Sequence, residues 1–227
     1  MKNIFLKAIF LLLVFTSGAA FSAPNFEGFQ LSAGVGSQGT NSSISESGGS
    51  ASSPVSSNIG STKFLSVLEA QYLKGITDNF LIGLGGTYNL TNANSMQSSR
   101  SLGYAGYPNS LNLTDQYAIF LQPTYVIKEG TAIYAKVNYN HARAQFNDQW
   151  YGNYQSGATN FGIRGYGFGI GLQNYLTDNI FVKFEGNYIR YQNTSATGTT
   201  TYYSPDLVNI SIQTTQVQGI FSIGYKF

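Results

Sequence analysis

Two acids and two bases could act together in this chain, because they lie at matched distances from short polar turns. Glu69 precedes one turn by eight residues, and Lys136 and Glu185 each follow another turn by six. Lys183 lies two residues before Glu185, so in a strand both side chains point to the same face. An isolated buried charge is costly, and we therefore expect Glu69 and Glu185 to pair with Lys136 and Lys183. Such a network is either a gate on a narrow ion path or a plug of paired charges, and we favour the plug.

His141 is the only histidine of the chain. With a nearby acid such as Asp115 or Asp148 and a loop serine, it could activate a nucleophile. No spacing motif ties these residues together, and the position beside Tyr139 and Asn140 is typical of a strand end. We therefore predict no catalytic site. One histidine and no cysteine also predict no metal site, and we expect no cofactor.

Exposed aromatic residues gather in polar stretches rich in Ser, Gly and Asn, a composition typical of adaptable binding surfaces. They make the candidate interaction residues of the loops, although we favour the alternative that they pack the loops together and rest on the lipopolysaccharide headgroup zone. The set is Tyr104, Tyr107, Trp150, Tyr151, Tyr154, Tyr202 and Tyr203.

Three tight polar turns begin at Thr77, Lys128 and Thr177, spaced 51 and 49 residues apart. They alternate with four longer polar stretches, near 38–62, 91–113, 144–162 and 193–211. The segments between them alternate in polarity, which predicts strands joined by hairpins. The predicted strands are 26–37, 63–75, 79–91, 114–127, 131–143, 163–176, 180–192 and 212–227.

The alternation assigns two faces to each strand. In 131–143 the apolar set Ile133, Ala135 and Val137 opposes Tyr134, Lys136 and Asn138. We expect the apolar faces to meet lipid and the other faces to meet a lumen. Tyrosines near strand ends are expected in two interfacial girdles: Tyr72, Tyr88, Tyr125, Tyr139, Tyr175, Tyr188 and Tyr225.

The N-terminus has the pattern of a secretory signal. Lys2 and Lys7 precede a short apolar run at 8–15, and small residues follow it. The run is shorter than the ~20 residues of a membrane-spanning helix. Cleavage after Ser22 fits best, with cleavage after Ala20 as the alternative. Without Lys2 and Lys7 the 12 basic residues become 10, equal to the 10 acidic ones, so no basic excess suggests nucleic acid.

The last strand alternates Phe221, Ile223, Tyr225 and Phe227 with smaller or polar residues, and the sequence ends on the aromatic. With the signal segment, the eight strands and the turn–loop asymmetry, this resembles the small outer-membrane β-barrel family, which includes the OmpA-like transmembrane domain, OmpX and the opacity-type porins. The resemblance covers nearly all of 24–227. It implies an all-β, eight-stranded antiparallel up-and-down barrel with short periplasmic turns and long extracellular loops, over 23–227 after a signal peptide at 1–22.

The resemblance also implies a location and a set of functions. The location is the outer membrane of a Gram-negative cell, and Phe221, Ile223, Tyr225 and Phe227 would form the signal that the barrel-assembly machinery reads. Lipid and lipopolysaccharide are the expected partners, with Arg100, Arg143 and Arg164 near lipid A phosphates. We expect a non-enzymatic scaffold that displays four loops to an unknown surface ligand. The alternatives are a narrow porin-like channel and, less favoured, a lipid A-modifying enzyme that would use His141.

Overall fold

The computed structural model describes residues 26–48, 55–98, 109–147, 158–200 and 206–227. The predicted signal segment lies outside these ranges. The described residues form ten strands and no helix that is long and apolar enough to cross a membrane. The strands are β1 (Gly28–Gly48), β2 (Val55–Gly75), β3 (Phe80–Asn89), β4 (Ala93–Ser98), β5 (Asn109–Lys128), β6 (Thr131–Asn147), β7 (Ala158–Tyr175), β8 (Ile180–Tyr191), β9 (Thr194–Thr200) and β10 (Asp206–Lys226).

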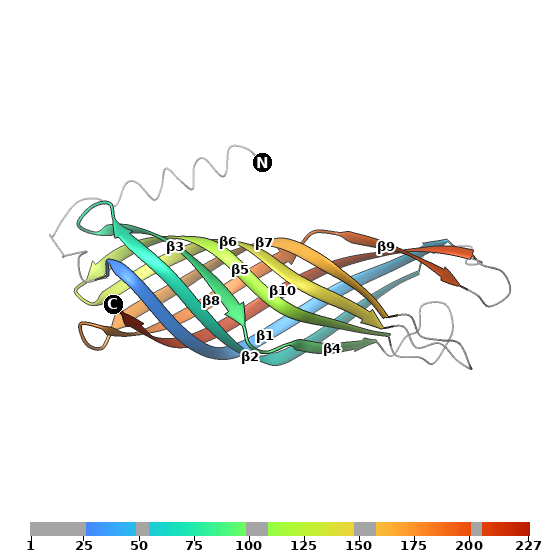
Figure 1. The fold of residues 1–227 in the computed structure, drawn as a ribbon, viewed down its shortest axis with the longest axis horizontal. Helices are drawn as coiled ribbons and strands as arrows, with labels where there is room; N and C mark the ends of the chain where they lie inside the picture. Colours follow the sequence, from blue (N-terminus) through green and yellow to red (C-terminus); the bar gives the residue numbers. More distant parts are fainter. Residues whose placement is uncertain (1–25, 49–54, 99–108, 148–157, 201–205) are drawn as a thin grey trace.

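The described strands close into an antiparallel barrel. Eight strands make up its circumference, because two of the ten extend the line of another strand. β4 continues the line of β3 along β5, and β9 continues the line of β8 along β10. The ring is closed where β1 pairs with β10, from Gln30 opposite Lys226 to Gly48 opposite Val208. The predicted all-β, eight-stranded barrel is therefore confirmed. Figure 1 shows the tilted strands, with the short turns and the C-terminus together at one end, here called the turn end.

A belt of exposed apolar side chains surrounds the half of the barrel nearest the turns. It includes Leu68, Leu84, Ile119, Phe168 and Phe184, each of which is exposed although large and apolar. Polar groups face inward on the same strands, as predicted for 131–143, where Lys136 and Asn138 are buried while Ile133 and Val137 are exposed. A closed barrel with an apolar outside and a polar inside is built for lipid.

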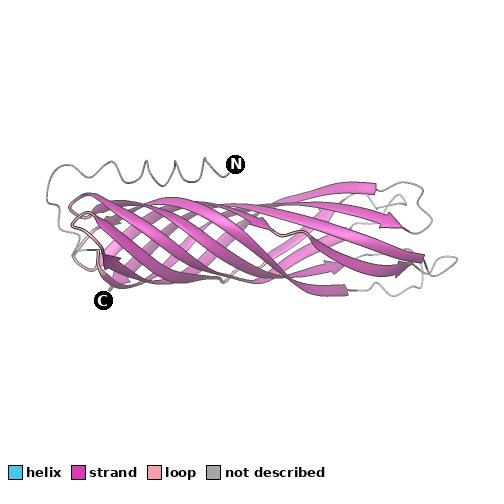
Figure 2. Ribbon diagram, turned by 90° about the horizontal axis from the view of Figure 1, so that it is seen from above, coloured by secondary structure: helices cyan, strands magenta, loops and turns pink. Residues whose placement is uncertain are grey.

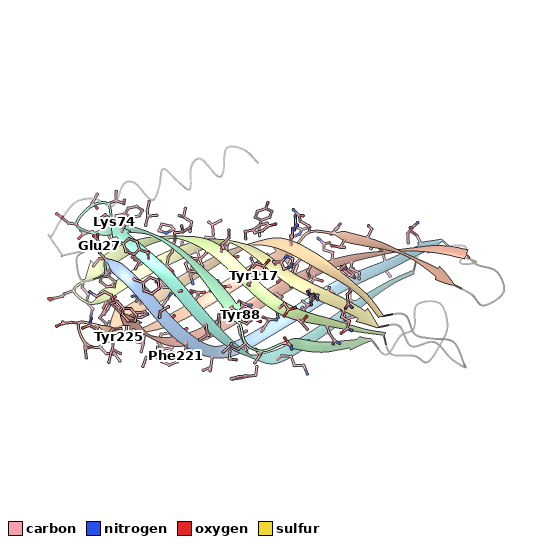
Figure 3. All side chains as sticks on the ribbon, viewed as in Figure 1. Glu27, Lys74, Tyr88, Tyr117, Phe221 and Tyr225 are labelled. Atoms are coloured by element: carbon pink, nitrogen blue, oxygen red, sulfur yellow. The ribbon has the colours of Figure 1, made fainter. Side chains whose placement is uncertain are left out.

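Tyrosines mark the edge of this belt that lies farther from the turn end, here called its upper edge. Tyr88 of β3 is paired directly with Tyr117 of β5, and both point outward (Figure 3). Tyr139 and Tyr166 are paired on β6 and β7, with ring centroids 5.4 Å apart. One predicted girdle residue is placed differently. Tyr175 points inward and packs on Phe26, because it is on the odd-numbered, inward face of β7.

The turn end carries an ion pair on its rim, also visible in Figure 3. Lys74 Nζ lies 2.5 Å from a Glu27 carboxylate oxygen, and the Gly75 backbone N–H donates to the other oxygen at 3.2 Å. These two hydrogen bonds, that from Lys74 first, hold the pKa of the Glu27 carboxyl below its usual value. The pair ties the residue that precedes β1 to the end of β2.

Beyond the tyrosines the strands separate into two groups, which can be followed at the right-hand end of Figures 1 and 2. Pairing of β2 with β3 ends at Val67 opposite Asn89, and pairing of β7 with β8 ends at Gly165 opposite Tyr191. From there outward, β9, β10, β1 and β2 form one sheet, and β4, β5, β6 and β7 form another. Edges left without a strand partner are tolerated here because they lie outside the apolar belt, where water can reach them.

In this part of the barrel beyond the tyrosines, here called the distal half, the polarity of the two faces changes. Many inward positions become apolar and form a buried cluster of Ile59, Leu111, Leu113, Ala142, Ala144, Ile163, Ile189, Tyr191 and Ile212. The inward positions of β1 stay polar, with Thr40 and Ser42 buried. Outward positions become polar, as at Asn41 and Thr62. On β5 a bulge changes which residues face inward. Asp115 adopts a left-handed φ of 49°, and the register shifts between Thr114 and Tyr117, so that both Leu113 and Gln116 point inward.

The strands are consequently longer than predicted, and much of each predicted loop is strand. The strand parts are 38–48 and 55–62, 93–98 and 109–113, 144–147 and 158–162, and 194–200 and 206–211. Ser, Thr and Asn suit an outward face in water, so a Ser-rich composition here does not prevent strand formation. The turn ends of the strands agree with prediction to within two residues.

Candidate functional site

Side chains fill the interior of the barrel in layers that are stacked along its axis. β2 contributes a side chain to each layer in turn. Its inward side chains from the turn end include Leu73, Gln71, Glu69, Val67, Leu65 and Ile59. Leu73 belongs to an apolar plug with Phe26, Leu81, Val126 and Ala132. Gln71 donates to Gln30 Oε1 at 2.8 Å, and Gln173 donates to the same oxygen at 3.2 Å. The candidate site is the charged layer that follows.

The charged layer brings Glu69, Lys136, Lys183 and Glu185 together. Lys136 Nζ lies 2.5 Å from Glu69 and 2.5 Å from Glu185, so it bridges β2 and β8 from its place on β6. Lys183 forms an ion pair with the other Glu69 oxygen. Both lysine side chains are 2% exposed. Two ammonium and two carboxylate groups balance, which is the condition under which buried charges are tolerated.

Aromatic and amide groups complete this layer, and the sequence analysis did not identify them as part of it. Tyr134 donates a hydrogen bond of 2.8 Å to Glu185, and Asn187 Nδ2 donates one of 2.7 Å to the other Glu185 oxygen. Lys136 Nζ lies 4.3 Å from the Phe120 ring centroid, within the range of a cation–π interaction. Strand alternation places Tyr134, Asn187 and Phe120 on inward faces. Their contribution to the layer depends on the charged groups that they contact.

The open space beside the charged layer is small. A cavity of about 30 Å³ lies against the charged layer and is lined by Glu69, Lys183, Asn140 and Asn187, among others. A larger hollow, of about 1070 Å³, lies on the outer wall among apolar belt residues such as Phe168 and Phe221, at the height that lipid covers. An interior of this kind fits the expectation for eight strands, whose lumen side chains can fill.

Glycines make room for the lumenal side chains. A methyl group at Gly171 of β7 would overlap the Tyr134 ring, and one at Gly167 would lie 2.1 Å from Asn138 Oδ1. The Gly-rich run in β7 therefore lets large groups of neighbouring strands occupy the interior.

His141 is placed at the upper edge of the belt and not in the charged layer. Its ring stacks on Tyr117, with centroids 4.9 Å apart, and it is paired across the sheet with Arg164. The acid considered with it, Asp115, forms an ion pair of 3.2 Å with Arg143. Asp148 lies outside the described residues.

The remaining candidates divide between the described barrel and the unplaced segments. Phe221, Ile223, Tyr225 and Phe227 are all exposed on the outer face at the turn end, where Phe227 N–H donates to the Phe29 carbonyl at 2.9 Å. Arg143 and Arg164 are exposed just above the tyrosines, and Arg190 lies beside them on β8. Arg100 and all seven aromatic loop candidates lie outside the described residues.

Comparison with known proteins gives a family match. The model of the outer membrane protein beta-barrel domain matches residues 8–226. No curated protein matches the chain.

Solved structures to which the chain is similar include the following three. Ail of Yersinia pestis is 14% identical, with 88% of this chain and 99% of that chain covered and a TM-score of 0.40. Neisserial surface protein A is 10% identical, with 88% and 98% covered and a TM-score of 0.42. The outer membrane protease OmpT of Escherichia coli is 10% identical, with 88% and 97% covered and a TM-score of 0.48. All three scores are below 0.5.

Proposed function

The chain belongs to the outer membrane protein β-barrel domain family, and from that premise we propose that it is a scaffold that holds external segments above the outer membrane of a Gram-negative cell. The observation that carries this proposal is the filled interior. An apolar plug, a neutral charged layer and a distal apolar core follow one another along the barrel axis. A wall that continues beyond the lipid belt with its own core supports loops, whereas a pore needs an open axis.

The channel is the alternative, and solute flux separates it from the scaffold. Protein refolded into liposomes should admit small sugars and monovalent ions no faster than empty liposomes do. A barrel of the same family with a known open lumen serves as the positive control. Flux above the empty-liposome rate would favour the channel and end the scaffold proposal in its present form.

If the barrel is a scaffold, its assembly should not depend on the sequence of the loops. Replacing Trp150, Tyr151 and Tyr154 by serine should leave the barrel assembled, measured as the heat-dependent shift in gel mobility that folded barrels show. The same variant, displayed on cells, should lose binding to any surface that wild-type cells bind through these aromatic residues. Loss of assembly would mean that the loops are part of the fold and not cargo.

Arg143, Arg164 and Arg190 are proposed to meet the phosphates of the outer leaflet. They lie on three adjacent strands on the distal side of Tyr139, Tyr166 and Tyr188, at the height where headgroups are expected. Arg164 and Arg190 are two residues from their tyrosines, and Arg143 is four residues from Tyr139. Guanidinium groups suit phosphate because they offer paired donors. Lipopolysaccharide in the vesicles should raise the melting temperature of wild type and not that of the triple Arg→Gln variant. Lys128→Gln, at the turn end, is the matched control and should keep the rise. An equal rise in all three proteins would end this assignment.

Lipid A modification remains the third function to test, because His141 lies near the same height. Mass spectrometry of lipid A from cells with and without the gene decides it. We propose identical spectra, and a difference lost in His141→Ala would establish an enzyme.

Export and assembly follow from the family but rest on segments that the structure does not place. We propose cleavage after Ser22, so that the purified mature protein begins at Ala23. N-terminal sequencing tests this directly, and a start at Met1 would contradict it.

A further inference from the structure

We propose that His141 is a further ligand of a lipid A phosphate, beside Arg164 and over Gly162, so that protonation of its ring strengthens the binding of the barrel to the outer leaflet. The inference rests on the proposed contact of the arginines with phosphate, and it adds a residue and a regulation to that same surface. Three observations carry it: the direction of the imidazole, the glycine beneath its edge and the balance of charges around it.

The imidazole of His141 is positioned by its neighbours on both sides. On β5, the Tyr117 ring stacks on it, with ring centroids 4.9 Å apart and the two planes inclined by 28°. On β7, a Cβ atom built at Gly162 would lie 3.1 Å from the imidazole Cε1 and 3.7 Å from Nε2. The edge of the ring that carries Nε2 therefore lies over Gly162.

The glycine lies between two arginine positions on the outward face. Gly162 is paired directly with Arg143 of β6, and Arg164 follows it by two residues on β7, opposite His141 itself. Gly162 and both arginines are exposed. Side chains opposite each other on paired strands have Cβ atoms about 4.5–5.5 Å apart, so one phosphate can contact both His141 and Arg164. Gly162 has no side chain that would cover the Nε2 edge from outside.

The charges around His141 make its protonation important. The titratable and charged groups that surround it in the described structure come from β5, β6 and β7, and they are Asp115, Tyr117, Tyr139, Arg143, Arg164 and Tyr166. Asp115 forms a 3.2 Å ion pair with Arg143, so this acid and this base largely offset each other. Arg164 then supplies the positive charge beside the ring, and a protonated imidazole doubles the charge that an anion meets.

A lipid phosphate is the anion that this arrangement suits. Arginine offers paired donors to phosphate, and a charged histidine donates from both ring nitrogens. A free phosphate ion would meet the same donors, but lipid A presents its phosphates at this height because its chains are inserted in the leaflet. Histidine is the side chain that changes charge between pH 5 and 8, so this contact should be stronger in mild acid.

Melting temperatures of the full mature protein in phosphatidylcholine vesicles test the proposal. The rise that added lipopolysaccharide causes is measured at about pH 5.5 and at about pH 8, on either side of the histidine range. In this rise, wild type should exceed His141→Gln by about 2–4 °C in acid and should equal it at the higher pH. The lipid phosphates also change charge over this range, but they do so equally for both proteins.

The outcomes separate the role of His141 from that of the arginines. No rise in wild type at either pH would overturn both assignments. Equal rises in wild type and His141→Gln at both pH values would leave the arginines as ligands and overturn the role of His141. If inorganic phosphate, without lipopolysaccharide, gave the same wild-type excess in acid, the assignment to a lipid would be overturned.

Two glycine variants test the position of the site. Gly162→Leu keeps His141 but covers its Nε2 edge, and it should abolish the excess in acid. Gly39→Leu is the matched control on the outward face of β1, where an added Cβ would lie 3.9 Å from its nearest neighbours, and it should keep the excess. Loss in both variants, or in neither, contradicts a site over Gly162.

Discussion

Lys136 and Glu69 form a 2.5 Å ion pair across the interior of the barrel, between β6 and β2, two strands that share no backbone hydrogen bonds. The pair connects distant parts of the wall through its centre. Glu185 joins from β8 at the same Nζ, so one ammonium group holds three strands.

Removing that ammonium group should destabilise the barrel strongly. Lys136→Met leaves two buried carboxylates to share Lys183, and we expect a loss of about 3–5 kcal/mol in the free energy of unfolding. Urea titration in lipid vesicles measures it. Lys128→Met, at an exposed turn position, should change little. The double variant Lys136→Met, Glu185→Gln should recover part of the loss because charge balance returns. Equal effects at 128 and 136 would show that the network is not a stabilising element.

The height of the lipid belt can be mapped by single cysteines, because the chain has none of its own. Thr62 and Leu68 are both exposed on the outer face of β2, but on opposite sides of the belt edge. In intact cells Thr62→Cys should react with a membrane-impermeant maleimide, and Leu68→Cys should remain protected by lipid. Equal labelling of the two positions would contradict the placement of the belt.

The last residue should matter for assembly more than its contacts suggest. Phe227 is 68% exposed and Phe64 is 64% exposed, so both rings face outward to a similar degree. Phe227→Ala should greatly reduce the amount of folded protein in the outer membrane, while Phe64→Ala should leave it nearly unchanged. Quantifying heat-modifiable protein in outer-membrane fractions gives the comparison. Similar yields of the two variants would remove the special role of the terminal aromatic.

The rim pair should make a small contribution to stability that depends on pH. The pKa of Glu27 is lowered in the folded state, so the unfolded chain binds the proton more readily. The contribution is therefore present at neutral pH and is lost as the pH falls below about 4. Both side chains are on the exposed rim, and the effect is small. Glu27→Gln should melt slightly below wild type at neutral pH and together with it in acid. The same difference at both pH values would exclude the pair as its cause.

Sequence alone could place the charged layer because two regularities act together. A strand alternates its faces with a period of two, and a short turn sets the height from which residues are counted. Glu69, Lys136 and Glu185 share both a face and a height, and the structure joins them. Tyr175 could have been placed inside by the same alternation, since its inward parity on β7 was visible in the sequence.

The distal half could not be predicted in this way. Outside the lipid belt the outward face consists mainly of Ser, Thr and Asn. The difference in polarity between the two faces therefore depends on a few scattered inward apolar residues, such as Ile59 and Ile212. The bulge at Asp115 also reverses the parity of β5, and strict alternation from Ile119 would have pointed Leu111 and Leu113 outward. The amide partners of the charged layer were missed because nothing in the sequence distinguishes Asn187 from other lumenal amides.

The most direct test of the closed interior is single-channel recording from purified protein in a planar bilayer. Wild type should show no unitary current steps at any applied voltage, in salt solutions where an open barrel of the family conducts. Lys136→Met should also remain closed, because the apolar plug and the distal core still fill the axis. Reproducible unitary currents from wild type would contradict the account and make the charged layer part of a pore.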